Sequence, residues 1–294
     1  MTTVTEVQQK WWGAHLREVR WQGELARLLA DPVWRGTDLP RGDGGPVLLI
    51  PGFLAGDQSL SVLATWLRRL GYAPRRAGIA FNVDCADRAI DRLEQVLGHA
   101  HLSSGRKVAI VGHSRGGHFA KALASRCPDA VSQVISMGSG LDDPFDISEV
   151  TRLAVGGVRR VIHRREPELA AKGCFTHTCV CRYTRDFAAP FPTGIPLTSI
   201  YSKGDGVVRW QACVVPYARC IEVPGSHIGL AFNRRAYREI AHTLASTRLA
   251  GTPGRGETGQ AAGRPQRASR QAEGAAEPLG AGRQAGQRPT GGDR

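Results

Sequence analysis

One stretch constrains this chain more than any other, a short apolar run that leads into Gly-His-Ser-Arg-Gly at residues 112–116. The run resembles a buried strand, and a segment of helical character follows it. Strand, sharp turn and helix in this order make the setting in which the serine of a G-x-S-x-G sequence becomes a nucleophile. The glycines have a steric role, because so tight a turn leaves no room for side chains two residues before and after the serine. The stretch predicts Ser114 as a nucleophile.

Strand-like and helix-like segments alternate on both sides of this turn. Expected strands cover residues 46–50, 73–81, 107–111, 131–137, 195–202 and 220–223, and expected helices cover residues 59–70, 85–102, 116–126 and 234–250. Such alternation predicts the α/β class, a mostly parallel sheet with helices on both faces. Ligands of such sheets bind at the carboxyl ends of the strands.

The same pattern divides the chain into parts. Residues 1–40 are expected to be a helical segment packed on the core, and residues 41–250 the α/β domain. Between about 141 and 196 the rhythm of elements fails, which indicates an inserted cap or lid over the site. Residues 251–294 are mostly Gly, Ala, Arg, Gln, Pro and Glu, so this tail cannot bury a core and is expected to be disordered.

The formal net charge of +13 comes almost entirely from arginine. Because no basic block exceeds two residues and no aromatic residues are interleaved, we expect no nucleic-acid partner. The tryptophans at positions 11, 12, 21 and 34 favour packing on the domain, with peripheral contact to a lipid surface as the alternative. The chain shows no membrane-length apolar run and no signal-peptide pattern, so we expect a cytoplasmic protein. The pattern does not predict an oligomeric state.

Seven cysteines, an odd number, exclude complete pairing within one chain. Cys174, Cys179 and Cys181 surround His177, but their spacing is not that of repeated C-x2-C pairs, so the pattern disfavours zinc. Disulfides bracing the cap and free, partly buried thiols stay open as equal alternatives. No metal and no cofactor are predicted.

A serine nucleophile needs a base, most often a histidine held by a carboxylate. In this topology the order is serine, acid, histidine, each in a loop after a strand. Asp205 follows the expected strand at 195–202, and His227 follows the one at 220–223. Order, placement and spacing therefore favour Asp205 as the acid and His227 as the base.

Other residues compete for these roles. Asp142 or Asp143, after the strand at 131–137, is the rival acid, and we prefer Asp205. His113 and His118 flank the nucleophile, but the turn points His113 away from the serine, so neither is favoured as the base.

The negative oxygen formed during acyl transfer needs backbone donors. We expect one from the residue after the nucleophile, Arg115, and one from the loop after an earlier strand. Gly52 lets the chain approach the substrate closely there, and Phe53 presents the amide.

Four stretches together resemble the signature segments of α/β-hydrolases. They are residues 50–53 (Ile-Pro-Gly-Phe), 112–117 (Gly-His-Ser-Arg-Gly-Gly), 202–208 (Ser-Lys-Gly-Asp-Gly-Val-Val) and 225–229 (Gly-Ser-His-Ile-Gly). The chain is most similar to bacterial triacylglycerol lipases and esterases, over residues 46–246. The resemblance implies a triad of Ser114, Asp205 and His227, with oxyanion amides at Phe53 and Arg115. The chain departs from many of these lipases in having Pro-Gly for His-Gly at the first stretch and no secretory signal.

The resulting hypothesis is a serine hydrolase that cleaves carboxylic esters through an acyl-enzyme, with a small acyl ester or a lipid as substrate. Thioester hydrolysis and acyl transfer use the same residues and are the alternatives. A serine rather than an aspartate at the turn argues against dehalogenase and epoxide-hydrolase chemistry. A non-catalytic binding scaffold is the alternative from another class.

Overall fold

The computed structural model describes residues 18–251 of the chain. Trp11, Trp12 and the tail that we expect to be disordered lie outside the described residues. No helix within the described range is both long and apolar enough to cross a membrane.

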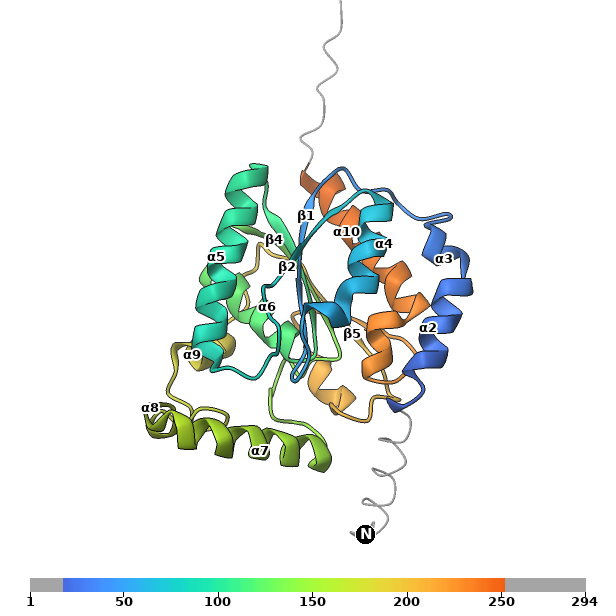
Figure 1. The fold of residues 1–294 in the computed structure, drawn as a ribbon. Coiled ribbons are helices and arrows are strands. Elements are labelled where there is room, and N and C mark those ends of the chain that lie inside the picture. Colours follow the sequence, from blue (N-terminus) through green and yellow to red (C-terminus); the bar gives the residue numbers. More distant parts are fainter. Residues whose placement is uncertain (1–17, 252–294) are drawn as a thin grey trace, which may run out of the picture. The chain divides into compact units, whose positions relative to one another are not determined.

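Six parallel strands form one sheet in the order β2-β1-β3-β4-β5-β6, which confirms the predicted α/β class (Figure 1). The strands are β1 (Pro46–Ile50), β2 (Ala73–Arg76), β3 (Val108–His113), β4 (Val131–Met137), β5 (Leu197–Tyr201) and β6 (Arg219–Glu222). β3 and β4 lie in the middle of the sheet, so the Gly-His-Ser-Arg-Gly turn emerges from its centre.

Helices cover both faces of the sheet (Figure 1). On one face lie α4 (Ser61–Leu70) and α10 (Arg234–Gly251), and on the other α5 (Ala86–Ser104) and α6 (Arg115–Arg126). Side chains alternate across β1, since Val47 and Leu49 join the first core and Leu48 and Ile50 join the second. Full burial of each such side chain contributes roughly 2 kcal/mol, so both faces of the strand hold the sheet between its helices.

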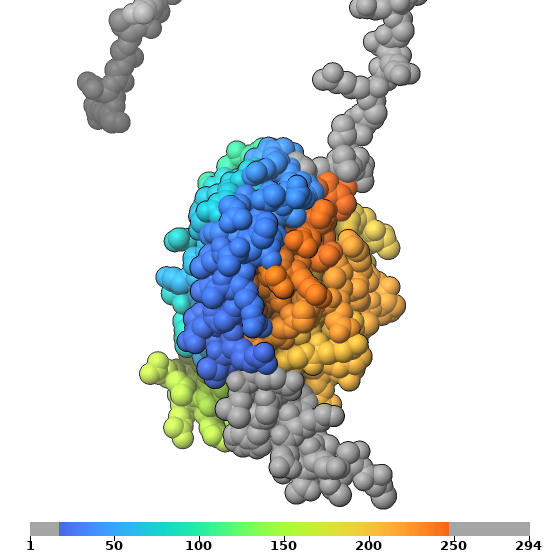
Figure 2. Space-filling view, turned by 90° about the vertical axis from the view of Figure 1, so that its right-hand side faces the viewer, coloured from blue at the N-terminus to red at the C-terminus, as the bar shows by residue number. Residues whose placement is uncertain are grey.

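The N-terminal segment packs against the first helical layer. α2 (Trp21–Ala30) and α3 (Pro32–Arg35) lie beside α10, the blue and orange residues of Figure 2. Trp66 Nε1 of α4 donates to the carbonyl of Val33 at 2.7 Å, and its ring contacts that of Tyr237. The hydrogen bond from Trp66 to Val33 ties the segment to this helical layer, and the residues just before α2 reach the site.

Between β4 and β5 the chain forms α7 (Glu149–Arg165), α8 (Pro167–Ala171) and α9 (Arg182–Ala188). In Figure 1, α7 lies apart from both helical layers. The sequence pattern predicted no clear periodic element here, and a helix as long as α7 is a correction. Apolar residues do recur along α7 at helical spacing, at positions 150, 153, 154, 158, 161 and 162, although none of them is fully buried. The start of α7 is nevertheless marked in the sequence by a capping residue, because the Ser148 side chain accepts a hydrogen bond from the amide of Thr151.

Another difference concerns β2, which ends at Arg76 instead of continuing to residue 81. The Asp57 carboxylate accepts from the amides of Ala77 and Gly78, and Gly78 has a positive φ of 73°. These contacts turn the chain out of the sheet after four residues.

Candidate active site

Ser114 occupies the strained turn that the sequence predicts. It stands between β3 and α6 with φ 53° and ψ −123°, a conformation that few non-glycine residues adopt. A Cβ on Gly112 would lie 2.4 Å from the carbonyl oxygen of Gly116, and one on Gly116 would lie 2.1 Å from that of Ile50. The predicted steric reason for both glycines is therefore confirmed.

Asp205 and His227 meet beside this turn. His227 Nδ1 lies 2.7 Å from Asp205 Oδ2, and both side chains are almost fully buried. The other carboxylate oxygen accepts from the amides of Val207 and Val208, at 2.8 Å each. Since an ionised carboxylate only accepts, Nδ1 carries the proton and Nε2 is left as the basic nitrogen.

Gly138, which follows β4, leaves the space in which this pair fits. A Cβ there would lie 3.2 Å from both Asp205 Oδ2 and His227 Nδ1. Ser114 and His227 line the same cavity. The hydrogen bond that the structure describes for the His227 ring is the one to Asp205. Bonds between nucleophile and base are often long until substrate binds, so this arrangement suits a proton transfer from Ser114 once the site is filled.

The rival residues lie elsewhere. Asp142 and Asp143 line the cavity wall, and Asp143 accepts from the amide of Phe145 and lies 3.9 Å from His177 Nδ1. The carboxylate that contacts His227 belongs to Asp205. The preference for Asp205 over these two therefore agrees with the geometry.

The two flanking histidines have other contacts. His113 Nε2 lies 2.9 Å from the carbonyl oxygen of His227, and burial lowers the pKa of His113 to about 4. His118 packs edge-on against Phe187, and burial lowers its pKa to about 3. Both rings are neutral at pH 7, and His113 supports the backbone of the base instead of the serine.

Two glutamates that the sequence analysis did not single out hold the loop of the base. Glu18 Oε1 accepts from the amides of His227 (2.9 Å) and Gly206 (3.1 Å), and Oε2 accepts from that of Ile228 (2.8 Å). Glu24 accepts from the amide and the hydroxyl of Ser226, at 2.9 and 2.8 Å. No local motif marks these residues, because their partners lie about 200 positions further along the chain.

Glu18 also acts on the electrostatics of the site. Burial alone lowers the pKa of His227, but the Asp205 carboxylate and then that of Glu18 outweigh it, so the pKa of His227 lies above its ordinary value. A raised pKa makes His227 a stronger base, provided that the solution pH keeps it neutral before the reaction.

The residues that we expect to supply the oxyanion amides belong to the Ser114 turn and to the loop that passes close to it. α6 begins at Arg115, so the Arg115 amide belongs to the first turn, whose N–H groups have no partner within the helix. The loop after β1 passes close by, since a Cβ on Gly52 would lie 3.0 Å from Ser114 Cβ. Phe53 and Arg115 both line the cavity. Asn82 Nδ2 donates to the carbonyl of Pro51 at 2.8 Å and holds this loop in place.

The cavity measures about 1260 Å³ and extends from Ser114 beneath the β4–β5 insertion. Its walls are mainly apolar and include Leu141, Val155, Phe175, Phe187 and Phe191. Lys121 is the notable polar group. Its Nζ donates to the carbonyl of Leu141 at 2.9 Å and lies 4.2 Å from the centre of the Phe187 ring. Burial lowers the pKa of Lys121 to about 8.

Comparison with known proteins agrees with this architecture. A family model described as the alpha/beta hydrolase fold matches residues 45–160, the part that carries β1 to β4 and the Ser114 turn. The chain has the α/β-hydrolase fold that its sequence segments suggested. No curated protein sequence matches it.

Solved structures similar to the chain include a soluble variant of monoglyceride lipase from Saccharomyces cerevisiae in complex with a substrate analogue. The TM-score is 0.50 at 15% identity, over 72% of this chain and 89% of that one. A monoacylglycerol lipase from Paleococcus ferrophilus has a TM-score of 0.48 at 14% identity, over 71% and 97% of the two chains. A thermophilic esterase from Thermogutta terrifontis has a TM-score of 0.47 at 18% identity, over 70% and 92%. At these identities the likeness concerns the fold alone.

Proposed function

We propose that the chain is a serine hydrolase that cleaves carboxylic esters, with Ser114 as nucleophile, His227 as general base and Asp205 as the residue that orients it. The proposal rests on one observation above all. A buried histidine, held at 2.7 Å by an aspartate, lines the same apolar cavity as a serine on a strained strand-to-helix turn. The esterase and lipase names among its structural relatives favour esters as the substrate class.

In the first half of the proposed reaction, Ser114 Oγ attacks the ester carbonyl while His227 Nε2 takes its proton. The carbonyl oxygen becomes negative and accepts from the amides of Phe53 and Arg115. Asp205 keeps the proton on Nδ1 and stabilises the charged ring. His227 then passes the proton to the leaving alcohol, the ester C–O bond breaks, and the acyl group stays on Ser114.

In the second half, His227 takes a proton from water, and the resulting hydroxide attacks the acyl carbonyl. The bond to Ser114 breaks, and the proton returns from His227 to Ser114 Oγ. The reaction needs no cofactor. The apolar cavity favours an aliphatic or aromatic acyl group, which suits a small acyl ester or a lipid.

Labelling with a fluorophosphonate, which reacts with activated serines, tests the proposal without a known substrate. The wild-type chain should be labelled, Ser114→Ala should not, and His227→Ala should be labelled far more slowly. Ser125→Ala on the same helix is the matched control and should behave as wild type, because Ser125 Oγ contacts only the helix backbone at Lys121. Labelling that persists in Ser114→Ala would refute the assignment, and an unlabelled, folded wild-type chain would favour a binding scaffold.

Thioester hydrolysis and acyl transfer use the same acyl-enzyme. Supplying esters and thioesters of matched acyl groups, with and without added alcohol acceptors, separates them through the products. Free acid as the main product from esters supports hydrolysis, and a new ester as the main product supports transfer.

A further inference from the structure

We propose that Cys85, Cys174 and Cys181, with Cys179 as fourth ligand, form a structural Zn²⁺ site that holds the insertion wall to the α/β core. This proposal does not depend on the catalytic one, since none of these thiols takes part in the reaction described above.

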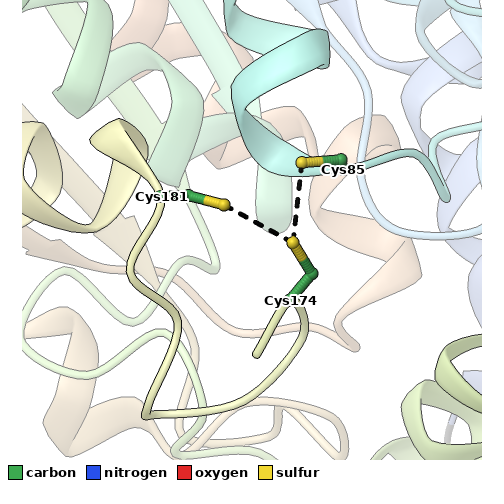
Figure 3. A group of neighbouring side chains, drawn as sticks. All are labelled: Cys85, Cys174 and Cys181. Carbon is green, nitrogen blue, oxygen red and sulfur yellow. Dashed lines mark hydrogen bonds between the residues drawn. The ribbon is translucent and has the colours of Figure 1, made fainter. Parts of the chain in front are cut away.

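The three sulfur atoms already have the separations of metal ligands (Figure 3). Cys174 Sγ lies 3.8 Å from Cys85 Sγ and 3.4 Å from Cys181 Sγ, and all three sulfurs lie within 4.8 Å of one another. Thiolates at about 2.3 Å from a tetrahedral zinc ion are about 3.8 Å apart. The three sulfurs form a compact triangle, so one ion can reach all three with small side-chain shifts.

A fourth thiol, that of Cys179, lies next to the cluster but outside the group whose sulfurs are all within 4.8 Å of one another, so it must move to reach the ion. Cys179 hydrogen-bonds Cys181 and packs against the cluster as a partly buried residue. Four-coordinate sites with cysteine ligands are a common form of structural zinc. Binding releases the proton of each thiol to solvent, so the ion and four thiolates carry a net charge of −2.

The surroundings suit such a charged, enclosed group. Cys85, Cys174 and Cys181 are buried together with Leu169, and Ile162 packs against them, which excludes solvent from the ion. Arg115 and Arg88 both interact electrostatically with Cys85. The Arg115 guanidinium is partly buried and donates to carbonyl groups of Asn82 and Asp84, and it forms no ion pair with a carboxylate within residues 18–251. A thiolate–zinc centre would place negative charge near this cation.

The competing use of these thiols is a disulfide. Cys174 lies close to two sulfurs and could pair with only one of them, which would leave Cys85 or Cys181 as a buried thiol. A disulfide also requires a sulfur separation of about 2.0 Å, well below the observed spacing. A shared ion uses all three sulfurs at once and therefore fits the arrangement better.

The ion would join parts of the chain that are far apart in sequence. Cys85 caps the N-terminus of α5, whereas Cys174 and Cys181 bracket the loop between α8 and α9, 89 residues later at the nearest pair. Phe175 in this loop has a positive φ of 65° and lines the cavity, and the Arg115 guanidinium lies 5.1 Å from its ring. Zinc would thus hold one wall of the cavity beside the residue that follows the nucleophile.

Elemental analysis of the full chain, purified under reducing conditions and dialysed against zinc and then metal-free buffer, tests the proposal. The wild type should retain about one zinc per chain, as a closed structural site does. Cys174→Ser and Cys85→Ser should retain less than about a tenth of that amount, because each loses a ligand to the ion. Cys220→Ser, a partly buried cysteine outside the cluster, is the matched control and should bind as wild type. A zinc-free wild type, or full binding by Cys174→Ser, would overturn the site.

Thiol labelling of the native wild-type chain gives an answer even where a variant fails to fold. With zinc bound, a chelator should expose about four additional thiols to maleimide, the number that a four-cysteine site protects. Cobalt added in place of zinc should produce the absorption of tetrahedral cobalt–thiolate bonds. If a reductant exposes these thiols to maleimide and a chelator does not, the thiols form a disulfide, and the metal site is refuted.

Discussion

Glu18→Gln tests whether the N-terminal carboxylate tunes the base. Glu18 accepts three backbone N–H groups of the loops that carry His227 and Asp205. Glutamine keeps one acceptor oxygen and replaces the other with an NH₂ group. The variant therefore removes a negative charge near the imidazole and presents a donor to a backbone amide, with almost no change in shape.

The electrostatic effect has a definite sign. His227 must be neutral to accept a proton, so the labelling rate falls as the pH drops through its raised pKa. The titratable groups that interact with the ring are Asp205, Glu18 and the neutral His113 and His118. At an effective dielectric constant of about 20, unit charges roughly 6 Å apart interact by about 3 kcal/mol, or about 2 pH units. The three amides that already solvate Glu18 reduce this effect, so we expect the acid limb to move down by about one unit.

The cost in stability follows from the same contacts. The amide of Ile228, which lies 2.8 Å from Oε2, would face the new NH₂ group and lose its acceptor. An unsatisfied buried donor costs about 1–3 kcal/mol, and the two remaining bonds lose the benefit of a charged acceptor. We expect the free energy of unfolding to fall by about 3 kcal/mol.

The assay is the rate of fluorophosphonate labelling between pH 5 and 9, with urea denaturation alongside. Glu24→Gln is the matched control, because Glu24 holds the adjacent Ser226 yet is not among the groups that shift the pKa of His227. The control should keep the wild-type acid limb. An unchanged limb in Glu18→Gln, or an equal shift in both variants, would refute the electrostatic role of Glu18.

Three further predictions follow from strain and burial. Ser114 has a φ of 53°, so Ser114→Gly should be more stable than Ser114→Ala by about 1 kcal/mol in urea denaturation, and the reverse order would contradict the strain. Burial lowers the pKa of His118 to about 3. As the pH falls below about 6.5, His118 is protonated in the unfolded chain but not in the folded one, so the free energy of unfolding decreases on the acid side. Between pH 7.5 and 5, His118→Leu should lose about 2 kcal/mol less stability than wild type, and parallel curves would rule this out. Arg126 is buried and lies 2.7 Å from Asp186 of α9, so Arg126→Met should lower the free energy of unfolding by about 3 kcal/mol, whereas a loss below about 1 kcal/mol would show that water replaces the pair.

Local pattern sufficed for the sheet and its helices. β1 is buried along its whole length and ends at Ile50, directly before Pro51, so its apolar composition and the proline that stops it both agree with the predicted strand. α4 and α5 each present a continuous apolar face to the sheet, which a helical period reveals. α7 also has apolar residues at helical spacing, but none of them is fully buried, because the helix lies over the cavity instead of packing into a core. Periodicity therefore indicates an amphipathic helix, and it does not by itself tell whether the apolar face is buried.

The same division applies to the site. Ser114, Asp205 and His227 could be proposed because each follows a strand, and the carboxyl ends of parallel strands meet at one edge of the sheet. Glu18 lies 209 positions from His227, and Cys85 lies 89 positions from Cys174. Those contacts depend on how the N-terminal segment and the insertion fold back on the domain, which no local spacing encodes.

These long-range contacts also show where resemblance to a family stops being informative. The family match begins at residue 45, yet the two carboxylates that hold the loop of the base come from Glu18 and Glu24. A chain trimmed to residue 45 would keep Ser114, Asp205 and His227 and would lose every hydrogen bond that these glutamates accept. Since a base must stay within reach of its nucleophile through two proton transfers, the segment before the family match belongs to the proposed site as much as the triad does.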